Sequence, residues 1–467
     1  MNVENLSDFS AHPQLFYGLD LAKKQSQLAV VAADGAELAN FAFPSTREHF
    51  RRLARAMRPE DKIVLEVSTP ANAVMSIFAK ESKGEAVLSN PLFTKSISKA
   101  VVKSDKEDAR KLANLKRADF LETVWHADAD TLRLRHFVND RESLVAVRTM
   151  LKNQVHSVLQ RNLIEYAFSD IFGAEGAAWL RQLLETDALD SFEKDRIRFL
   201  LAEIARQTAL VDDLDATIAA FIRSRAALSH QLDLLMSVPG VSLCVGAVVL
   251  SAAGDITRFP TKQKFASYFG LTHRLKQTGG KAPRTGPISK QGNAYARFML
   301  IEAAEHFKDS PPVYRKLYER IKKKKGHNKA IVAVARRLAE LIWCLLTRNE
   351  EFVYAPPRLT QEKRAKVSKL AREKAGLKIA RKATNQIVRG TNLRGREIKE
   401  EIRRRAADEA SRIADLMNHG KRLGEASPSG FNPRKPNFTD WHKLLETVAK
   451  NYARELSGEE NKEDKEM

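Results

Sequence analysis

The chain has 467 residues, which predicts two or three domains, and its 43% of hydrophobic residues is enough for more than one packed core. A formal net charge of +21 favours a polyanionic partner, most often nucleic acid, with a basic structural protein as the alternative. The only cysteines are Cys244 and Cys344, which excludes a cysteine-rich zinc cluster and argues against a disulfide scaffold.

The first residues, MNVENLSDFSAHPQ, lack the charged-then-apolar pattern of a secretion signal. No apolar run approaches the ~20 residues that a bilayer-spanning helix needs. We therefore expect a cytoplasmic, nucleoid-associated protein with no membrane partner.

The first 125 residues alternate strand and helix patterns. Asp34-Gly35 is a hairpin turn signal between two apolar, β-prone runs. The expected elements are strands at 15–22, 26–33 and 36–44, a helix at 46–58, a strand at 62–68, a helix at 70–84 and a strand at 85–91. A three-stranded meander followed by βα units is the order of a ribonuclease-H-like (RuvC-like) α/β domain, which we expect over residues 1–128.

Four acids in this region suggest a metal site. Asp20 ends the first strand and Glu66 lies near the end of the fourth, and these two strands are parallel neighbours in a ribonuclease-H-like sheet. Asp105 and Asp108 are spaced i,i+3, which puts both on one face of a helix. Four converging carboxylates repel one another unless a hard cation such as Mg²⁺ lies between them. Two Mg²⁺ roughly 4 Å apart are suited to phosphodiester chemistry.

The same acids also have ordinary explanations. A strand-end Asp is commonly a turn residue, and an Asp-x-x-Asp on a helix is commonly solvated surface with nearby cations as partners. Glu66 is the more informative residue, because a charge inside the apolar run KIVLEVS needs a reason.

Two long stretches with a seven-residue apolar repeat follow. They predict an antiparallel helical hairpin or coiled coil over residues 129–232, with ordinary bundle packing as the alternative. The repeating residues are Phe137, Leu144, Leu151 and Val158, then Ile197, Ile204, Val211 and Ile218. Arg148 and Lys152 lie near one face of the first stretch, where they face either nucleic acid or solvent.

Residues 233–350 predict a second, mainly helical domain. Its segment SVPGV precedes an apolar helix and resembles a helix-hairpin-helix element, in which backbone N–H groups meet a DNA phosphate; a simple helix start is the alternative. Residues 351–467 predict a basic helical extension with a disordered end.

The loop LKQTGGKAPRTGPISKQGN, residues 275–293, is glycine-rich, carries four cations and contains no acid. Such a loop suits a phosphate, because glycines such as Gly279 let the backbone approach closely. Thr278 offers a hydroxyl that could attack the phosphate or merely hydrogen-bond to it. The cations expected to neutralise a DNA strand are Lys276, Lys281, Arg284, Lys290 and Arg297.

These motifs resemble those of insertion-sequence-110 family transposases, which include the Piv-type DNA invertases. The resemblance rests on GLDLAK at the first strand, on the four acids and on the block SVPGV…AAGDITRF…KFASYFGLTHR…TGGK…ISKQGNAYAR, and it covers roughly residues 15–345. It implies a RuvC-like domain, a coiled-coil linker and a C-terminal transposase domain that completes a composite active site. It further implies Mg²⁺, DNA, a structured guide RNA and homodimers that assemble into a tetramer.

One departure from the family concerns the nucleophile. The family loop typically has Gln or Ser followed by Ser-Gly, and its serine is the proposed nucleophile, whereas this chain has Gln277-Thr278-Gly279. Thr278 has the same attacking atom with an added methyl that restricts χ1. Alternatives are that Ser289 substitutes, that catalysis is impaired, or that the protein is a RuvC-like nuclease or resolvase that uses water and forms no covalent intermediate. A non-catalytic nucleic-acid-binding protein is a further alternative.

Overall fold

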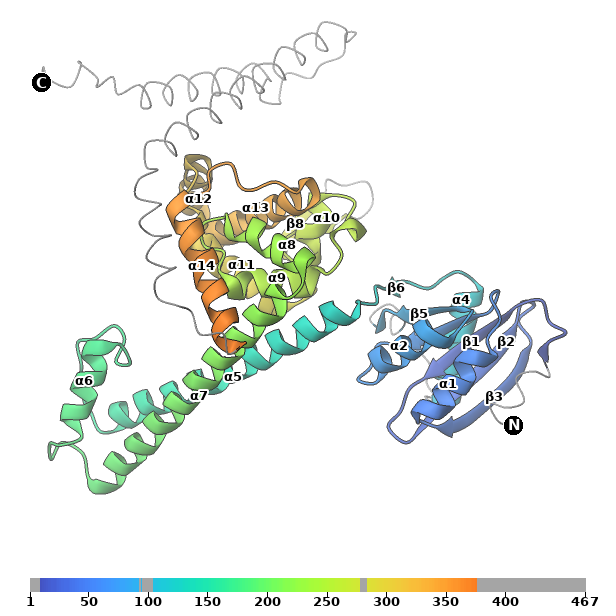
Figure 1. Ribbon diagram of the computed structural model, residues 1–467, viewed down its shortest axis with the longest axis horizontal. Helices are drawn as coiled ribbons and strands as arrows, with labels where there is room; N and C mark the ends of the chain where they lie inside the picture. Colours follow the sequence, from blue (N-terminus) through green and yellow to red (C-terminus); the bar gives the residue numbers. More distant parts are fainter. Residues whose placement is uncertain (1–8, 92–93, 95–103, 278–283, 376–467) are drawn as a thin grey trace, which may run out of the picture. The chain divides into compact units, whose positions relative to one another are not determined.

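The computed structural model describes residues 9–91, 94, 104–277 and 284–375 (Figure 1). The chain divides into two units, Met1–Gly376 and Leu377–Met467. The second unit lies outside the described residues, and with it most of the expected extension and its expected disordered end.

The N-terminal domain is built on a six-stranded sheet with the order β3-β2-β1-β4-β5-β6. The strands are β1 (Leu15–Asp20), β2 (Gln25–Ala32), β3 (Glu37–Pro44), β4 (Lys62–Glu66), β5 (Glu85–Ser89) and β6 (Thr123–Val124). β1, β4 and β5 run parallel, whereas β2, β3 and β6 are antiparallel to their neighbours. This mixed sheet fits the expected ribonuclease-H-like order, and β6 is an addition to it.

Helices cover both faces of the sheet. On one face, α1 (Arg47–Ala56) and α2 (Ala71–Glu81) share a core with alternate residues of β1, namely Leu15, Tyr17 and Leu19. On the opposite face, α4 (Asp105–Arg117) packs against β1, β2 and β4 (Figure 1). Because successive side chains of a strand point to opposite faces, the remaining residues of β1, Gly18 among them, lie on the α4 side.

Two long antiparallel helices follow the sheet domain. They are α5 (Ala129–Arg161) and α7 (Ser191–Arg223), with α6 (Ala174–Leu183) between them (Figure 1). The pairs Arg141–Asp215 and Arg161–Glu193 fix the antiparallel direction. Residues of both heptad stripes, such as Leu151 and Ile204, are buried in one core with α6.

The C-terminal half of the described chain is a helical body with one small hairpin. Its helices are α8 (Ala226–Met236), α9 (Leu243–Ala253), α10 (Lys262–Tyr268), α11 (Ala294–Phe307), α12 (Pro312–Lys325), α13 (His327–Arg348) and α14 (Pro357–Lys374), with a short 3₁₀ turn η2 (Ile256–Arg258). The hairpin consists of β7 (His273–Lys276) and β8 (Arg284–Ile288). α14 packs on α7 and α8, so the domain boundary expected at residue 351 falls inside the first unit.

The segment expected to resemble a helix-hairpin-helix element forms the turn between α8 and α9. Its Gly240 has a φ of 81°, and a Cβ there would overlap the carbonyl oxygen of Ala303 in α11. Lys363 of α14 donates hydrogen bonds of 2.8 Å and 2.9 Å to the carbonyls of Val238 and Val241. The turn is therefore engaged in packing between helices. No helix in the described part of the chain is long and apolar enough to span a membrane.

Candidate active site

Asp20 and Glu66 end two strands that lie side by side in the sheet. β1 and β4 pair in parallel, and the last aligned pair is Leu19 with Leu65. Each of these leucines is followed directly by the acid, and both acids are partly buried. Because parallel strands end at the same edge of a sheet, the two carboxylates belong to neighbouring positions on that edge.

Both acids belong to the face of the sheet that α4 covers. Asp20 lies two residues beyond Gly18, and Glu66 lies two residues beyond Val64, so each pair shares a face. A Cβ at Gly18 would overlap the carbonyl oxygen of Ala109, which shows that α4 touches β1 at this position. Leu65 belongs instead to the core on the α1 and α2 side.

The direction of α4 brings its acidic first turn towards the same edge. At its C-terminal end, Arg117 donates to the carbonyl of Ala33, and Lys116 pairs with Glu85, the first residue of β5. At its N-terminal end, the side-chain amide of Asn40 donates to the carbonyl of Lys106 at 3.1 Å. α4 therefore runs antiparallel to β1 and begins near the end where β1 and β4 finish.

The first turn of α4 carries Asp105 and Asp108. Ser104 caps the helix, and its hydroxyl accepts a hydrogen bond from the N–H of Glu107. Asp105 is exposed, whereas Asp108 is partly buried with the ammonium of Lys111 3.5 Å from its carboxylate. The three acids of this turn are also favourable for the N-terminal end of the helix dipole.

The four side chains have the donor chemistry of a metal site. All four side chains offer carboxylate oxygens, which are the ligands that Mg²⁺ prefers. The acids are not, however, at ligating distances from one another: within the described ranges, no three His, Cys, Asp or Glu side chains lie close enough together to hold an ion. The segment 95–103, which leads into α4, lies outside those ranges.

The candidate hydroxyl loop joins β7 to β8. Thr278, Gly279 and Lys281 lie outside the described residues, and Lys276 and Arg284 face each other as the last aligned pair of the hairpin backbone. The base of the hairpin is held by Arg274, which donates to the carbonyl of Ser289 at 2.9 Å. The candidate hydroxyl loop is therefore connected to a hairpin whose base is hydrogen-bonded.

Two predicted DNA-contacting residues follow the hairpin. Lys290 is exposed, with a φ of 55°. Arg297 donates to the carbonyls of Phe269 and Gln291, both at 3.3 Å, so its guanidinium fixes the turn that precedes α11. Any contact of Arg297 with DNA stays a prediction.

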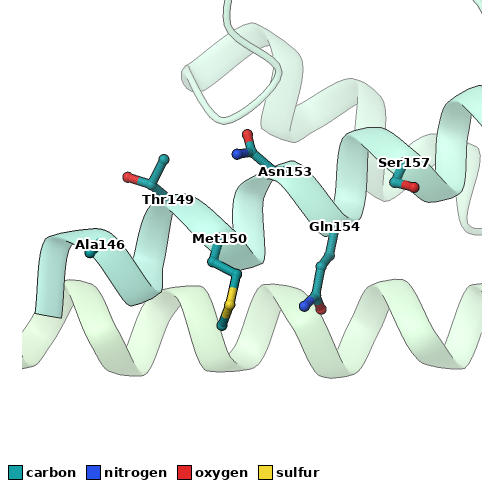
Figure 2. Close-up of a pocket in the computed structure, with 6 residues that line it drawn as sticks. All are labelled: Ala146, Thr149, Met150, Asn153, Gln154 and Ser157. Carbon is teal, nitrogen blue, oxygen red and sulfur yellow. The ribbon is translucent and has the colours of Figure 1, made fainter. Parts of the chain in front are cut away.

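The predicted residues on α5 have local surroundings of their own. Lys152 lies with its ammonium 4.6 Å from the ring centroid of Phe172, and Arg148 is partly buried. A hollow on the same helix contains no ionisable side chain, and its Met150 and Gln154 point towards α7 (Figure 2). Its lining consists of Ala146, Thr149, Met150, Asn153, Gln154 and Ser157. This hollow therefore lacks the groups needed for phosphodiester chemistry.

A cluster around Trp125 has no counterpart in the sequence prediction. The guanidinium of Arg258 lies 4.4 Å from the centroid of the Trp125 ring and donates to the carbonyl of Ala253 at the end of α9. Arg135 lies over the same ring and donates to the carbonyl of Ser251. Burial, and next the charge of Arg135, lower the pKa of the neighbouring His126. The one sequence feature that could have indicated this cluster is the position of Trp125, a large aromatic residue in the connection between β6 and α5.

Known proteins match both halves of the chain. A family model described as Transposase, of the DEDD type, matches residues 17–163, and a model described as Transposase IS116/IS110/IS902 family matches residues 232–319. The first range contains all four candidate acids, and the second contains the candidate hydroxyl loop.

Several curated relatives are also similar. The transposase for insertion sequence element IS1111A of Coxiella burnetii is 26% identical over 54% of this chain and 68% of its own length. A probable family 20 transposase of Pseudomonas aeruginosa is 29% identical over 55% of this chain and 76% of its own. The pilin gene-inverting protein of Moraxella bovis is 22% identical over 72% of this chain and 97% of its own.

Together with the mixed α/β domain and the helical half that follows it, these matches define the class of protein as a DNA transposase or recombinase. The chain belongs to the IS116/IS110/IS902 family of transposases. DEDD transposases are generally metal-dependent, and membership of the family makes DNA the partner.

Proposed function

We propose that the protein breaks and rejoins DNA with the acids Asp20, Glu66, Asp105 and Asp108 and the hydroxyl of Thr278. The observation that supports this most is the pairing of β1 with β4, which ends both strands in an acid on the side that α4 covers. Two Mg²⁺ ions, when bound by these carboxylates, supply positive charge at the scissile phosphate and favour loss of the hydroxyl proton.

The residues of the chain then have the following roles. The oxygen of Thr278 attacks phosphorus and forms an O–P bond, while the bond from phosphorus to the 3′ oxygen breaks. The threonine proton is lost and the departing 3′ oxygen gains one, which leaves a 3′-OH and a 5′-phosphothreonine linkage. Rejoining reverses these changes with a new 3′-OH, so the bond energy is retained and no nucleotide cofactor is consumed.

The cations of the loop hold the strand during this exchange. Lys276, Lys281, Arg284 and Lys290 neutralise phosphates, and Gly279 gives the backbone close access to one. In this proposal the threonine and the acids come from different subunits of a dimer that assembles into a tetramer. A structured guide RNA, contacted in part by Arg148 and Lys152 of α5, selects the DNA.

The direct test is a covalent adduct. The protein, a guide RNA encoded beside its gene and DNA spanning the element end are incubated with Mg²⁺, and a denaturant-resistant protein–DNA adduct is sought. We expect Thr278→Ala to abolish the adduct, Thr278→Ser to retain it, and Ser289→Ala to leave it in place. Cleavage that persists in Thr278→Ala without an adduct would identify a hydrolytic nuclease instead.

The carboxylates are tested separately from the nucleophile. Asp20→Asn removes a charge and keeps the side-chain shape, so we expect Mg²⁺-dependent cleavage to fall by at least about 100-fold while DNA binding changes less than about 3-fold. Asp34→Asn, in an exposed turn of the same domain, is the control. Unchanged cleavage in Asp20→Asn refutes the metal assignment.

A further inference from the structure

A second positively charged surface lies where α12 ends and α13 begins. Residues 315–329, RKLYERIKKKKGHNK, contain eight lysines and arginines and one acid. We call the group of Lys322, Lys323, Lys324, Lys325 and Lys329 the basic corner. None of these five lysines belongs to the segments that carry the four candidate acids or to the candidate hydroxyl loop of residues 275–293.

The charge of the basic corner is exposed and uncompensated. Every residue from 322 to 329 is exposed. In the part of the chain that the structure describes, no carboxylate lies within ion-pair distance of any of the five lysines. Two other cations of the helical body do have carboxylate partners: Lys308 pairs with Glu305 at 2.6 Å, and Arg337 pairs with Glu340 at 2.6 Å.

Side-chain contacts connect the three helices next to the basic corner. Tyr318, only 5% exposed, shares a hydrogen bond of 2.8 Å with the imidazole of His327, the first residue of α13. The other imidazole nitrogen lies 3.0 Å from the carboxylate of Glu305. The ammonium of Lys322 lies 5.3 Å from the centroid of the Tyr318 ring. These contacts join α11, α12 and α13, so the helix ends that carry the lysines are held in position relative to α11.

Helix stability alone does not account for the basic corner. Cations in the last turn of α12 interact favourably with its dipole, by about 0.3–1 kcal/mol each when exposed. Four consecutive lysines, however, also repel one another. Lys329 lies in the first turn of α13, where a cation is unfavourable for the dipole. An unpaired group of this kind is instead suited to a polyanion.

We propose that the basic corner binds the phosphodiester backbone of double-stranded DNA. The proposal relies on the proposed function only in taking DNA as the substrate. Single-stranded nucleic acid is generally held by exposed aromatic side chains that stack on bases. The one Phe, Tyr or Trp of the segment 315–329 is Tyr318, and it is buried. The imidazole of His327 is held by the Tyr318 hydroxyl and the Glu305 carboxylate. Lysines without such aromatics favour contact with the backbone of a duplex, independent of sequence.

The test compares two variants of the full chain with equal charge. One carries Lys322→Gln, Lys323→Gln, Lys324→Gln and Lys325→Gln. The control carries Lys80→Gln, Lys83→Gln, Arg181→Gln and Lys366→Gln, which are four exposed cations scattered over other elements. Each variant lowers the formal net charge from +21 by four, to +17. Circular dichroism and thermal unfolding check that both variants remain folded.

Binding to a labelled duplex of arbitrary sequence is measured by fluorescence anisotropy over a range of salt, without Mg²⁺. We expect the corner variant to bind at least about 10-fold more weakly near ~0.1 M salt, with a salt slope reduced by about 0.9 for each phosphate that the protein no longer neutralises. The control is expected to change affinity less than about 3-fold.

Three results would overturn the proposal: unchanged binding by the corner variant, equal weakening in both variants, or a weakening confined to a structured RNA of equal length. Equal weakening would mean that the charge acts diffusely, and an RNA-only effect would assign the surface to RNA. Failure of the proposed function is a separate outcome, because Thr278→Ala should bind the duplex in this Mg²⁺-free assay as tightly as the unchanged protein, whatever the adduct test shows.

Discussion

Gly18 determines how closely α4 approaches the strand that carries Asp20. A Cβ at this position would overlap the carbonyl oxygen of Ala109 and lie 2.6 Å from the backbone nitrogen of Ala113. These neighbours are helix backbone, which has no flexible end that could turn aside. The absence of a side chain in β1 therefore allows the acidic turn of α4 to lie against the edge where β1 and β4 end.

Gly18→Ala is expected to displace α4 from the sheet. The overlap should lower the free energy of unfolding by about 1–3 kcal/mol, and the displaced acids should reduce Mg²⁺-dependent cleavage further than the lower stability explains. Urea unfolding and a cleavage assay at a temperature where the variant is folded provide the measurements. Gly286→Ala is the matched control for stability only, because its Cβ would meet atoms only at 3.7 Å and beyond. Cleavage by Gly18→Ala that equals cleavage by the unchanged protein would contradict this role for Gly18.

The positions of the candidate acids Asp20 and Glu66 were easier to predict from the sequence than the contacts that orient α4. Asp20 and Glu66 stand out because each ends an apolar run, and the strand order then makes them neighbours. The interactions that orient α4 join residues far apart in the chain, such as Glu37 with Arg110 at 2.7 Å. No local periodicity signals such a pair. Thr278 was predicted from its loop and lies outside the described residues, so its role stays a prediction.

At the scale of elements, periodicity predicted the long segments and missed the short ones. The heptad stripes indicated α5 and α7, because a repeat sustained over several turns is a strong signal. β6 has two residues, which is too short for an alternating pattern, and it is paired only because β5 lies beside it. The first part of the basic helical extension expected after residue 351 is a packed element, since Val367 and Ala371 of α14 are buried.

The connection between β6 and α5 is held at Trp125. A Cβ at Gly254, which has a φ of 59°, would overlap the Trp125 ring, so glycine at the end of α9 makes room for it. Arg135 and Arg258 lie over the ring and donate to carbonyls at the end of α9. The ring therefore anchors the start of α5 on the helical body.

Trp125→Ala is expected to release this connection. Removal of a partly buried indole should cost about 2–4 kcal/mol, and limited proteolysis should show faster cleavage between residues 117 and 129. Trp125→Phe should restore part of the protection, because a ring remains for the guanidinium of Arg258. Trp179→Ala is the control, since it removes a tryptophan from the tip of the hairpin. Its proteolysis should leave 117–129 uncut, and equal cutting in both variants would argue against a local anchor.

At the scale of the whole molecule, the composition indicated a nucleic-acid partner but not where each positive charge belongs. Several cations that the composition alone would allow to bind DNA phosphates instead make contacts within the fold. Arg141 makes a bidentate pair with Asp215, and Lys363 and Arg364 donate to backbone carbonyls of the α8–α9 region. The basic corner differs because its lysines have no such partners among the described residues. Only the three-dimensional arrangement distinguishes these two groups.

The first unit, ending at Gly376, gives a prediction about where the folded body stops. A chain of residues 1–376 should unfold cooperatively with the stability of the full chain. A chain of residues 1–350 lacks α14, which exposes the apolar surface that Val367 covers and removes the hydrogen bonds from Lys363 to the α8–α9 turn. We expect it to be less stable by at least about 2 kcal/mol or to aggregate, as measured by urea unfolding and size-exclusion chromatography.

Point variants separate this packing from the effect of shortening the chain. Val367→Asp places a charge on the buried face of α14, whereas Lys366→Asp places the same charge on an exposed position one residue away. Because an unpaired buried carboxylate is costly, only the first should reproduce the instability of the 1–350 chain. If neither variant were destabilised, α14 would have to be assigned to the extension and the body would end before it. Destabilisation by both variants would make the added negative charge, and not burial at Val367, the cause.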